Sequence, residues 1–326
     1  MKLVALAGAF VFGLTTVAIA LPYLFLWQQP QQVQTAPTPF PVSVNPLTKT
    51  ITESPQIDAI LAAHDSRLTA AANDAGGVLG MLVSAFTSTS VYRLLAAVDA
   101  PQIVTIEPGY REEQVALVFG KALGWDARQQ AAFLASMATT SPTLVEGEFS
   151  PGTYAIPPGA TPADVQKALY QRFYDQVLEH YSTTTSAIVP LSQTLTIASM
   201  IERETGDPGD MRIISGIMWN RLFLNMKLQI DSTVQYAEAD RAKSGSWWPA
   251  VRTKNLFIDS PYNTYVHTGL PPTPIAEPSV AAVLAALNPV KTSCLYYFHD
   301  AYGQLHCSDT YQQHVALLKK YYGRGK

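Results

Sequence analysis

The segment at positions 195–206, LTIASMIERETG, constrains the fold most strongly because its apolar residues recur at helical spacing. One face of that helix carries residues at positions i, i+3, i+4 and i+7: Ile197, Met200, Ile201 and Glu204. Burial disfavours the charged form of a carboxyl group, so the pKa of Glu204 should rise. A protonated carboxylic acid is the usual proton donor to a glycosidic oxygen, which makes Glu204 a candidate catalytic acid. A helix-end Glu paired with a nearby Arg is the alternative.

Glu202 lies about 200° around the same helix from Glu204, because successive residues turn by about 100°. It shares its face with small residues such as Ala198 and Ser199, and it could be buried and hydrogen-bonded or simply solvated. Periodicity therefore favours Glu204 as the acid and keeps Glu202 as the second candidate. Arg203 points between the two faces, and we expect it to be exposed.

An uncharged apolar run fills positions 3–27 and is long enough to span a bilayer as a helix. Lys2 precedes it, which places the rest of the chain outside the cytoplasm. We expect residues 1–27 to be a retained single-pass anchor in the cytoplasmic membrane, with the catalytic part on the extracytoplasmic (periplasmic) side. A cleaved signal peptide is the alternative, since Ala18-Ile19-Ala20 is similar to a cleavage site.

Charge and metal-ligand spacing exclude two function classes. The net charge is −3 without a basic cluster, so nucleic acid is a poor partner. The C-terminal part does gather four possible metal ligands: His299, His306, Cys307 and His314. Their spacing fits no recognised zinc arrangement, so we expect neither a metal nor another cofactor.

The pattern along the chain predicts an α+β protein in five parts. Residues 28–56 are rich in Gln, Pro and Thr and predict a semi-extended tether after the anchor. Residues 57–100 predict two amphipathic helices of unknown role. Residues 101–190 predict a small α+β module with a connecting helix, and residues 191–326 a mixed α+β domain that carries both glutamates.

The α+β module is predicted from a repeated order of strand, Pro-Gly turn and helix. The repeats fall at 103–106, 107–109 and 112–123, then at 154–156, 157–159 and from 162 to about 182. In the last part we expect helices after Pro190 and at 211–224, 281–287 and 310–322, with a hairpin of strands 295–298 and 304–307.

Several segments resemble motifs of the YceG-like (MltG) family, the endolytic murein transglycosylases. The string ASMIERET at 198–205 is similar to the family's A-S-aliphatic-aliphatic-E-[KR]-E signature. Further similar segments follow the family's order: VEGEFSPGTY (145–154), NRL (220–222), LQIDST (228–233), SPYNTY (260–265), GLPPTPIAEPS (269–279) and LNPVKTSCLYYF (287–298). The resemblance covers roughly residues 104–322, and the combined order is more specific than any single motif.

This resemblance implies an exported enzyme with a LysM-like module and a domain that cleaves peptidoglycan glycan strands internally. The second Glu of the signature is the catalytic one in the family, which corresponds to Glu204, with Glu202 as the fallback. One acid is sufficient for a lytic transglycosylase, because the C6 hydroxyl of N-acetylmuramic acid closes a 1,6-anhydro ring. Cell-wall synthases and the division machinery are plausible neighbours of an enzyme tethered to the membrane.

Loop residues with ring, amide and carboxyl groups are candidates for substrate binding: Gln229, Asp231, Tyr262, Asn263 and Tyr265. Ordinary loop packing is the alternative for each. Asp231 could be a helix-start residue or a second carboxylate, and the latter would make a two-carboxylate glycoside hydrolase plausible. Asn220 and Arg221 could orient carboxylates. A non-catalytic, membrane-tethered cell-wall binding protein is the other functional class.

The two cysteines depart from the family, which commonly has an aromatic residue near position 294 and Phe near position 307. If the hairpin turn spans 299–302, the numbers of residues that pair across it sum to 601, as those of Cys294 and Cys307 do. Such partners lie within reach of a disulfide, which an oxidising compartment permits. A register error of one residue would leave two packed free thiols instead.

Overall fold

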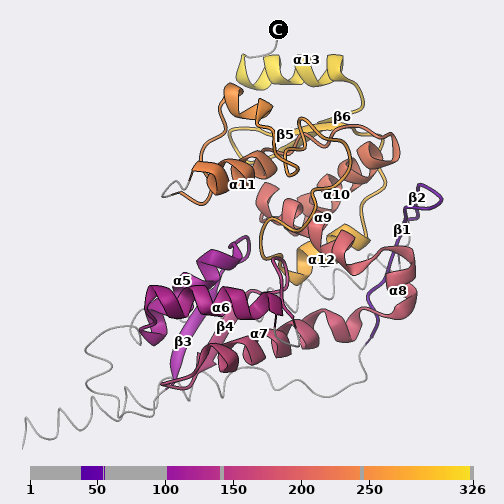
Figure 1. Cartoon of the computed structure of the whole chain (residues 1–326). Helices are drawn as coiled ribbons and strands as arrows, with labels where there is room; N and C mark the ends of the chain where they lie inside the picture. Colours follow the sequence, from indigo (N-terminus) through magenta and orange to yellow (C-terminus); the bar gives the residue numbers. More distant parts are fainter. Residues whose placement is uncertain (1–37, 54, 56–100, 140–142, 243–245, 324–326) are drawn as a thin grey trace, which may run out of the picture. The chain divides into compact units, whose positions relative to one another are not determined.

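The computed structural model describes residues 38–53, 55, 101–139, 143–242 and 246–323 (Figure 1). The expected anchor at 1–27 and the expected helices at 57–100 lie outside these residues. In the part of the chain that the structure describes, no helix combines the length and the apolar character needed to cross a membrane. The chain divides into two compact units at Asp175 and Gln176, and residues 38–53 belong to the second unit. The described residues form a mixed α+β protein, mostly helical with small sheets.

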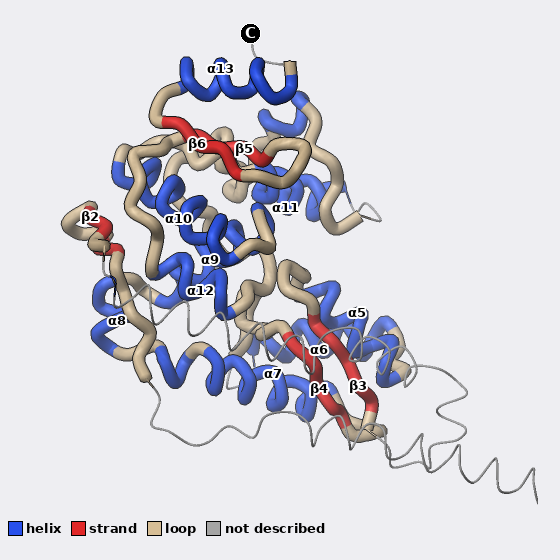
Figure 2. The backbone as a smooth tube through the Cα atoms, turned by 180° about the vertical axis from the view of Figure 1, so that it is seen from behind, coloured by secondary structure: helices blue, strands red, loops and turns tan. Residues whose placement is uncertain are grey.

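The first unit is built on strands β3 (Gln102–Ile106) and β4 (Gly152–Ile156), which pair antiparallel (Figure 2). Between them lie α5 (Glu112–Leu123) and α6 (Ala127–Thr139), and α7 (Pro162–Gln176) follows β4. The two predicted strand–turn–helix repeats are confirmed, whereas α6 was not predicted from the sequence. The core of this unit consists of fully buried side chains: Val115, Phe119, Phe133, Phe149 and Leu169.

Two local features explain why the helices of this unit begin where they do. Gly109 and Gly159 have φ values of 79° and 76°, a left-handed conformation that glycine adopts without steric strain, so each strand can turn into its helix. The buried carboxyl group of Glu146 accepts a hydrogen bond from the backbone N–H of Glu112 at 2.9 Å, at the start of α5. Burial raises the pKa of Glu146 to about 8. Glu146 belongs to the VEGEFSPGTY segment, which therefore has a structural task in this unit.

The second unit has a helical layer of α8 (Thr183–Ile188), α9 (Leu191–Glu204), α10 (Pro208–Phe223), α11 (Asp231–Ala242) and α12 (Val280–Leu287). Short 3-10 turns lie at η2 (Leu178–His180) and η3 (Thr253–Phe257). The expectation of one helix running to position 182 is wrong, because α7 ends at Gln176 and α8 starts only after η2.

Helices α9, α10 and α12 pack against one another and form the core of this layer. The fully buried indole of Trp219 on α10 donates a hydrogen bond to the carbonyl oxygen of Ala286 on α12 at 2.9 Å. A Cβ atom at Gly216 would lie 2.2 Å from the carbonyl oxygen of Val290, so only glycine permits this close approach. The tight packing fixes α9, whose last residue is Glu204.

A C-terminal layer adds strands β5 (Tyr296–His299) and β6 (Leu305–Ser308) and helix α13 (Tyr311–Tyr322). The predicted disulfide between Cys294 and Cys307 is confirmed, with a Cα–Cα distance of 5.8 Å. The predicted register is wrong, because Cys307 pairs directly with Tyr297 and the numbers of paired residues sum to 604. The turn is longer than expected, since the backbone N–H of Asp300 bonds to the carbonyl oxygen of Gln304.

Part of the predicted tether is folded in the second unit. Strands β1 (Val44–Asn45) and β2 (Thr50–Ile51) form a small hairpin, and the side chains of Phe40 and Val44 are buried. The backbone N–H of Ser43 bonds to the carbonyl oxygen of Leu287 at the end of α12. Residues 38–53 are therefore part of the folded unit, which corrects the tether expectation for this stretch.

Candidate active site

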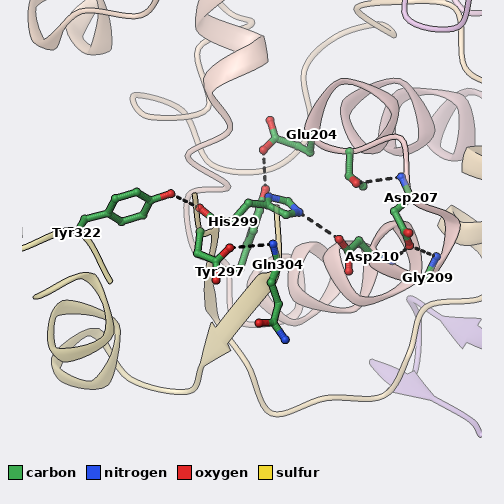
Figure 3. A network of polar contacts seen from close by, with 10 residues as sticks. Glu204, Asp207, Gly209, Asp210, Tyr297, His299, Gln304 and Tyr322 are labelled. Carbon is green, nitrogen blue, oxygen red and sulfur yellow. Dashed lines mark hydrogen bonds and ion pairs between the residues drawn. The ribbon is translucent and has the colours of Figure 1, made fainter. Parts of the chain in front are cut away.

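The site is centred on Glu204 at the C-terminal end of α9, where the chain reverses into α10 (Figure 3). The helix ends because Thr205 is extended, with φ −160° and ψ 150°. Asp207 then caps α10 by accepting hydrogen bonds from the backbone N–H groups of Gly209 and Asp210. These two features end α9 at Glu204 and start α10 soon after it, so Glu204 lies at a helix terminus.

Two hydroxyl groups hold the carboxyl group of Glu204. The hydroxyl of Tyr297 donates to Oε2 at 2.8 Å, and the hydroxyl of Ser232 donates to Oε1 at 3.2 Å. Burial raises the pKa of Glu204, and the negative charge of Asp231 raises it further. The hydrogen bonds from Tyr297 and Ser232 and the proximity of His299 lower it, without cancelling the effect of burial. The group can therefore be protonated at a higher pH than an ordinary Glu, as the apolar stripe predicted.

Tyr297 and His299 alternate with Tyr296 and Phe298 along β5, so the two pairs lie on opposite faces of the strand. On the first face Tyr297 contacts Glu204, and Nε2 of His299 lies 3.2 Å from Oδ2 of Asp210 on α10 (Figure 3). Burial and the charge of Glu204 raise the pKa of Tyr297, so its hydroxyl stays a donor.

The opposite face of β5 packs against α13. The rings of Tyr296 and Phe298 contact His314 with centroid separations of 5.5 and 5.8 Å, and Phe298 also contacts Tyr322. The hydroxyl of Tyr322 in turn donates to the backbone carbonyl of His299 (Figure 3). Helix α13 therefore braces the strand that supplies Tyr297 to the site.

A second carboxylate lies next to this cluster. Asp231, exposed at the first residue of α11, accepts a hydrogen bond from the hydroxyl of Tyr265 at 2.6 Å through Oδ1. Its neighbour Ser232 contacts Glu204 directly. Burial, with the adjacent charges of Asp231 and Glu204, raises the pKa of Tyr265, so this hydroxyl also remains a donor. The structure thus brings Glu204, Asp231 and Tyr265 together.

Arg221 fixes the backbone around the site instead of pairing with a carboxylate. Its buried guanidinium donates to the backbone carbonyls of Leu295, Leu228 and Lys227 at 2.6, 2.7 and 3.1 Å, and to the side chain of Gln229 at 3.3 Å. These bonds join the segment before β5 to the segment before α11.

Asn220 acts similarly, because its amide donates to the carbonyls of Thr292 and Cys294. The expected orientation of carboxylates by these two residues is therefore replaced by orientation of the backbone.

Comparison with known proteins places the chain in a family. The sequence model of the YceG-like family matches residues 81–320. The chain belongs to the YceG-like family. It is 36% identical over 178 residues to an endolytic murein transglycosylase of Bacillus subtilis, a match that covers 54% of this chain and 48% of that protein. It is 28% identical over 248 residues to the protein of the same name from Streptococcus pneumoniae D39, covering 66% of this chain and 45% of that protein.

This YceG-like chain therefore spans about half the length of these relatives. It is also similar in structure to a YceG-like protein from Listeria monocytogenes, known from a crystal structure. The TM-score is 0.58 at 25% sequence identity, and the match covers 74% of this chain and 82% of that chain. The two proteins therefore share their fold over most of both chains.

Within the YceG-like signature the two glutamates have different environments. Oε2 of Glu202 accepts hydrogen bonds from the backbone N–H and the hydroxyl of Ser279, at 2.9 and 2.5 Å. Ser279 is the N-cap of α12, so Glu202 fastens the start of that helix to α9. Arg203 between them is half-buried, with its guanidinium 3.9 Å from the centre of the Trp248 ring, which corrects the expectation that it is exposed.

The remaining candidates for substrate binding lie in the loop before α12. The amide of Asn263 is fully buried, donates to the carbonyls of Leu256 and Ile258 and accepts from the backbone N–H of Tyr265, which organises the loop. The ring of Tyr262 lies 4.7 Å from that of Tyr236. Among the described residues, the side-chain hydrogen bonds to Glu204 come from Ser232 and Tyr297, and neither Asn263 nor Tyr262 donates one.

Gln229 lies two residues before Asp231, in the segment that leads into α11. It is exposed with φ 55°, an uncommon conformation for a residue other than glycine, and its N–H bonds to the carbonyl oxygen of Thr264.

Sequence reasoning missed three groups of the site: Tyr297, Ser232 and the pair of His299 with Asp210. Tyr297 and Ser232 lie inside YceG-like segments that were recognised, but nothing local distinguishes a hydroxyl that faces Glu204 from one that faces elsewhere.

The possible metal ligands are divided between other interactions. His306 pairs with Asp300 at 2.8 Å, and Cys307 is in the disulfide. Among the described residues, no group of three His, Cys, Asp or Glu is placed to hold a metal ion.

Proposed function

We propose that this chain is an endolytic lytic transglycosylase of peptidoglycan. It would cleave the bond between N-acetylmuramic acid and N-acetylglucosamine inside glycan strands and leave 1,6-anhydro ends. The observation that carries the proposal is the carboxyl group of Glu204, half-buried with a raised pKa and held by Tyr297 and Ser232. Membership of a family whose named relatives are endolytic murein transglycosylases supports it.

In the first step, protonated Glu204 gives its proton to the leaving glycosidic oxygen as the bond to C1 breaks. The 2-acetamido oxygen of the substrate stabilises C1 in place of an enzyme nucleophile. In the second step, the ionised carboxylate of Glu204 takes the proton of the C6 hydroxyl, whose oxygen bonds to C1 and closes the ring. The proton that left Glu204 is thereby restored, and no water is consumed.

The hydrogen bonds around Glu204 suit this exchange. Tyr297 donates to Oε2 at 2.8 Å, the shorter of the two hydrogen bonds, so we assign the transferable proton to Oε1. The hydroxyl of Ser232 can rotate away from Oε1, because its hydrogen bond to that oxygen is long, at 3.2 Å. Ionisation of Glu204 after the first step is stabilised by the Tyr297 hydroxyl, which donates more strongly to a carboxylate than to a neutral acid.

The proximity of Asp231 supports a second candidate, a glycoside hydrolase with two carboxylates. Asp231 lies close enough for its charge to raise the pKa of Glu204, and it could activate water. A tethered binding protein without activity is the third possibility. The three differ in their products: anhydro ends, ends heavier by one water, or no cleavage.

We further propose that residues 1–27 anchor the chain in the cytoplasmic membrane and that the glutamate site lies on the extracytoplasmic side. The unit of β3, α5, α6 and β4 would be a LysM-like module that holds glycan. An anchored enzyme would act on strands close to the membrane, near cell-wall synthases and the division machinery.

The test is digestion of purified peptidoglycan by the full chain in detergent, followed by mass analysis of the products. Wild type should release anhydro-ended fragments, and Glu204→Gln should release none. Glu179→Gln, which changes an exposed carboxylate on η2, is the matched control and should behave as wild type. An active Glu204→Gln would reject Glu204 as the acid, hydrated ends would establish the hydrolase, and wild type that binds glycan without cutting it would establish the binding protein.

A further inference from the structure

The carboxylate of Asp231 is fixed in direction and open on one side. Tyr265 donates to Oδ1 at 2.6 Å, and Asp231 is exposed although its neighbours Ser232 and Thr233 are buried. Among the residues that the structure describes, none donates a hydrogen bond to Oδ2. A charged acceptor held by a tyrosine is therefore presented to solvent at the start of α11.

This acceptor lies beside the acid. Ser232, the next residue, touches Oε1 of Glu204, which is the oxygen that would hold the transferable proton. The charge of Asp231 raises the pKa of Glu204, and the charges of both carboxylates raise the pKa of Tyr265. The three groups therefore lie close enough to interact electrostatically. In a sugar whose glycosidic oxygen meets Glu204, the acetamido nitrogen is on C2, the carbon bonded to C1, so this group lies next to the reacting bond and near the two carboxyl groups that Ser232 and Tyr265 contact.

The chemistry of the 2-acetamido group matches such an acceptor. When its carbonyl oxygen bonds to C1, positive charge develops on the amide and its N–H becomes more acidic. A carboxylate that accepts this N–H turns the carbonyl oxygen toward C1 and stabilises the developing charge. We propose that Asp231 accepts a hydrogen bond from the 2-acetamido N–H of the N-acetylmuramic acid whose C1 reacts, with Tyr265 as the positioning residue for Asp231. This inference rests on the proposed function.

The step balances without a co-reactant. The acetamido oxygen bonds to C1, the bond from C1 to the leaving oxygen breaks, and the proton of Glu204 goes to that oxygen. The N–H proton stays on nitrogen, hydrogen-bonded to Asp231. When the C6 oxygen replaces the acetamido oxygen at C1, its proton returns to Glu204 and the neutral amide is restored.

The experiment compares two glycan probes in the full chain. Strands are chemically N-deacetylated, and half of them are re-acetylated with acetic anhydride, so both probes have the same length distribution. Cleavage rates at saturating glycan give the preference of each enzyme for the acetylated probe. Using saturating rates removes any difference in binding between an amine and an amide. Asp259→Ala, an exposed carboxylate in the loop after η3, is the matched control.

We expect Asp231→Ala to lose on the order of 10- to 100-fold of the wild-type preference, the range for a lost hydrogen bond to a charged group. Tyr265→Phe should lose a smaller part, and Asp259→Ala none. Asp231→Asn keeps the shape of the side chain and replaces Asp231→Ala if that variant does not fold. We expect its preference for the acetylated probe to be reduced severalfold. A merely structural role would slow both probes equally.

The outcomes separate this inference from the proposed function. If wild type makes anhydro ends and the preference is unchanged in Asp231→Ala or in Asp231→Asn, the inference is overturned and the function stands. If wild type makes ends heavier by one water and the Asp231 variants do not, Asp231 is the base that activates water. The hydrolase then replaces both proposals. If wild type cuts neither probe, the proposed function and this inference are both rejected.

Discussion

The hydroxyl of Tyr297 on β5 donates a hydrogen bond to Oε2 of Glu204 at the end of α9, across 2.8 Å and 93 positions of sequence. The strand that supplies Tyr297 is held by α13 on one side and by the disulfide of Cys307, the direct cross-strand partner of Tyr297. The protonation of Glu204 therefore depends on elements that come late in the chain.

Tyr297→Phe should change the pH dependence of cleavage. The first step needs protonated Glu204, so the rate falls as the pH rises through the pKa of that group. The Tyr297 hydrogen bond lowers this pKa, so its removal should raise the pKa and move the alkaline limb of the profile to higher pH. We expect kcat to fall roughly tenfold, because ionised Glu204 loses a donor. An alkaline limb that does not move, measured beside Tyr302→Phe at a tyrosine that is 95% exposed, would contradict this.

Asp231→Asn should move the same limb in the opposite direction. The charge of Asp231 raises the pKa of Glu204, so a neutral side chain should lower that pKa and bring the alkaline limb to lower pH. The measurement is the profile of kcat against pH on one glycan preparation. An alkaline limb that stays in place or moves to higher pH in Asp231→Asn would contradict the electrostatic effect of Asp231 on Glu204.

Glu202→Ala should reduce stability rather than chemistry. It removes the acceptor for two hydrogen bonds from Ser279 at the start of α12, and we expect a loss of about 1–2 kcal/mol in the free energy of unfolding. Urea unfolding gives this value, and the rate per folded molecule should change little. Complete loss of cleavage in a stably folded Glu202→Ala would instead assign Glu202 to the reaction.

Arg221→Met should be strongly destabilising. Arg221 is 7% exposed, and loss of its guanidinium leaves the carbonyls of Leu295, Leu228 and Lys227 without their donor. We expect the free energy of unfolding to fall by about 3 kcal/mol or more. Arg128→Met, at an exposed position of α6, is the control and should stay within about 0.5 kcal/mol of wild type. Similar midpoints for the two variants in urea would refute the bridging role.

The disulfide should contribute to the stability of the layer formed by β5, β6 and α13. Cys294 and Cys307 are separated by 13 positions, and a closed loop of this length stabilises a folded chain by about 3 kcal/mol. The double Ser variant, and wild type treated with a thiol reductant, should both unfold at lower urea concentration than oxidised wild type. The reductant should have no effect on the double variant, and identical midpoints for all samples would contradict the prediction.

Local patterns were sufficient for the elements whose signals lie close together in sequence. The repeated strand, Pro-Gly turn and helix of the first unit was predicted because turn chemistry and hydrophobic period are local properties. Helix α6 was missed, since Phe133, Leu134 and Met137 are its only large apolar residues and the helix is fixed by contacts such as that of Phe133 with Phe119. The disulfide was predicted through a wrong register, because the length of the turn after His299 depends on side-chain bonds of Asp300.

The sequence by itself determined that Glu204 lies on an apolar helical stripe. Such a stripe faces the protein interior, and burial is the physical reason for the raised pKa of Glu204. Only the tertiary structure decided which hydroxyls touch that carboxyl, that Glu202 fastens α12, and that Arg221 serves backbone carbonyls. Those relations join segments far apart in the chain. They arise when α9, α10, α12 and β5 pack, and no local spacing specifies the direction in which a polar side chain then points.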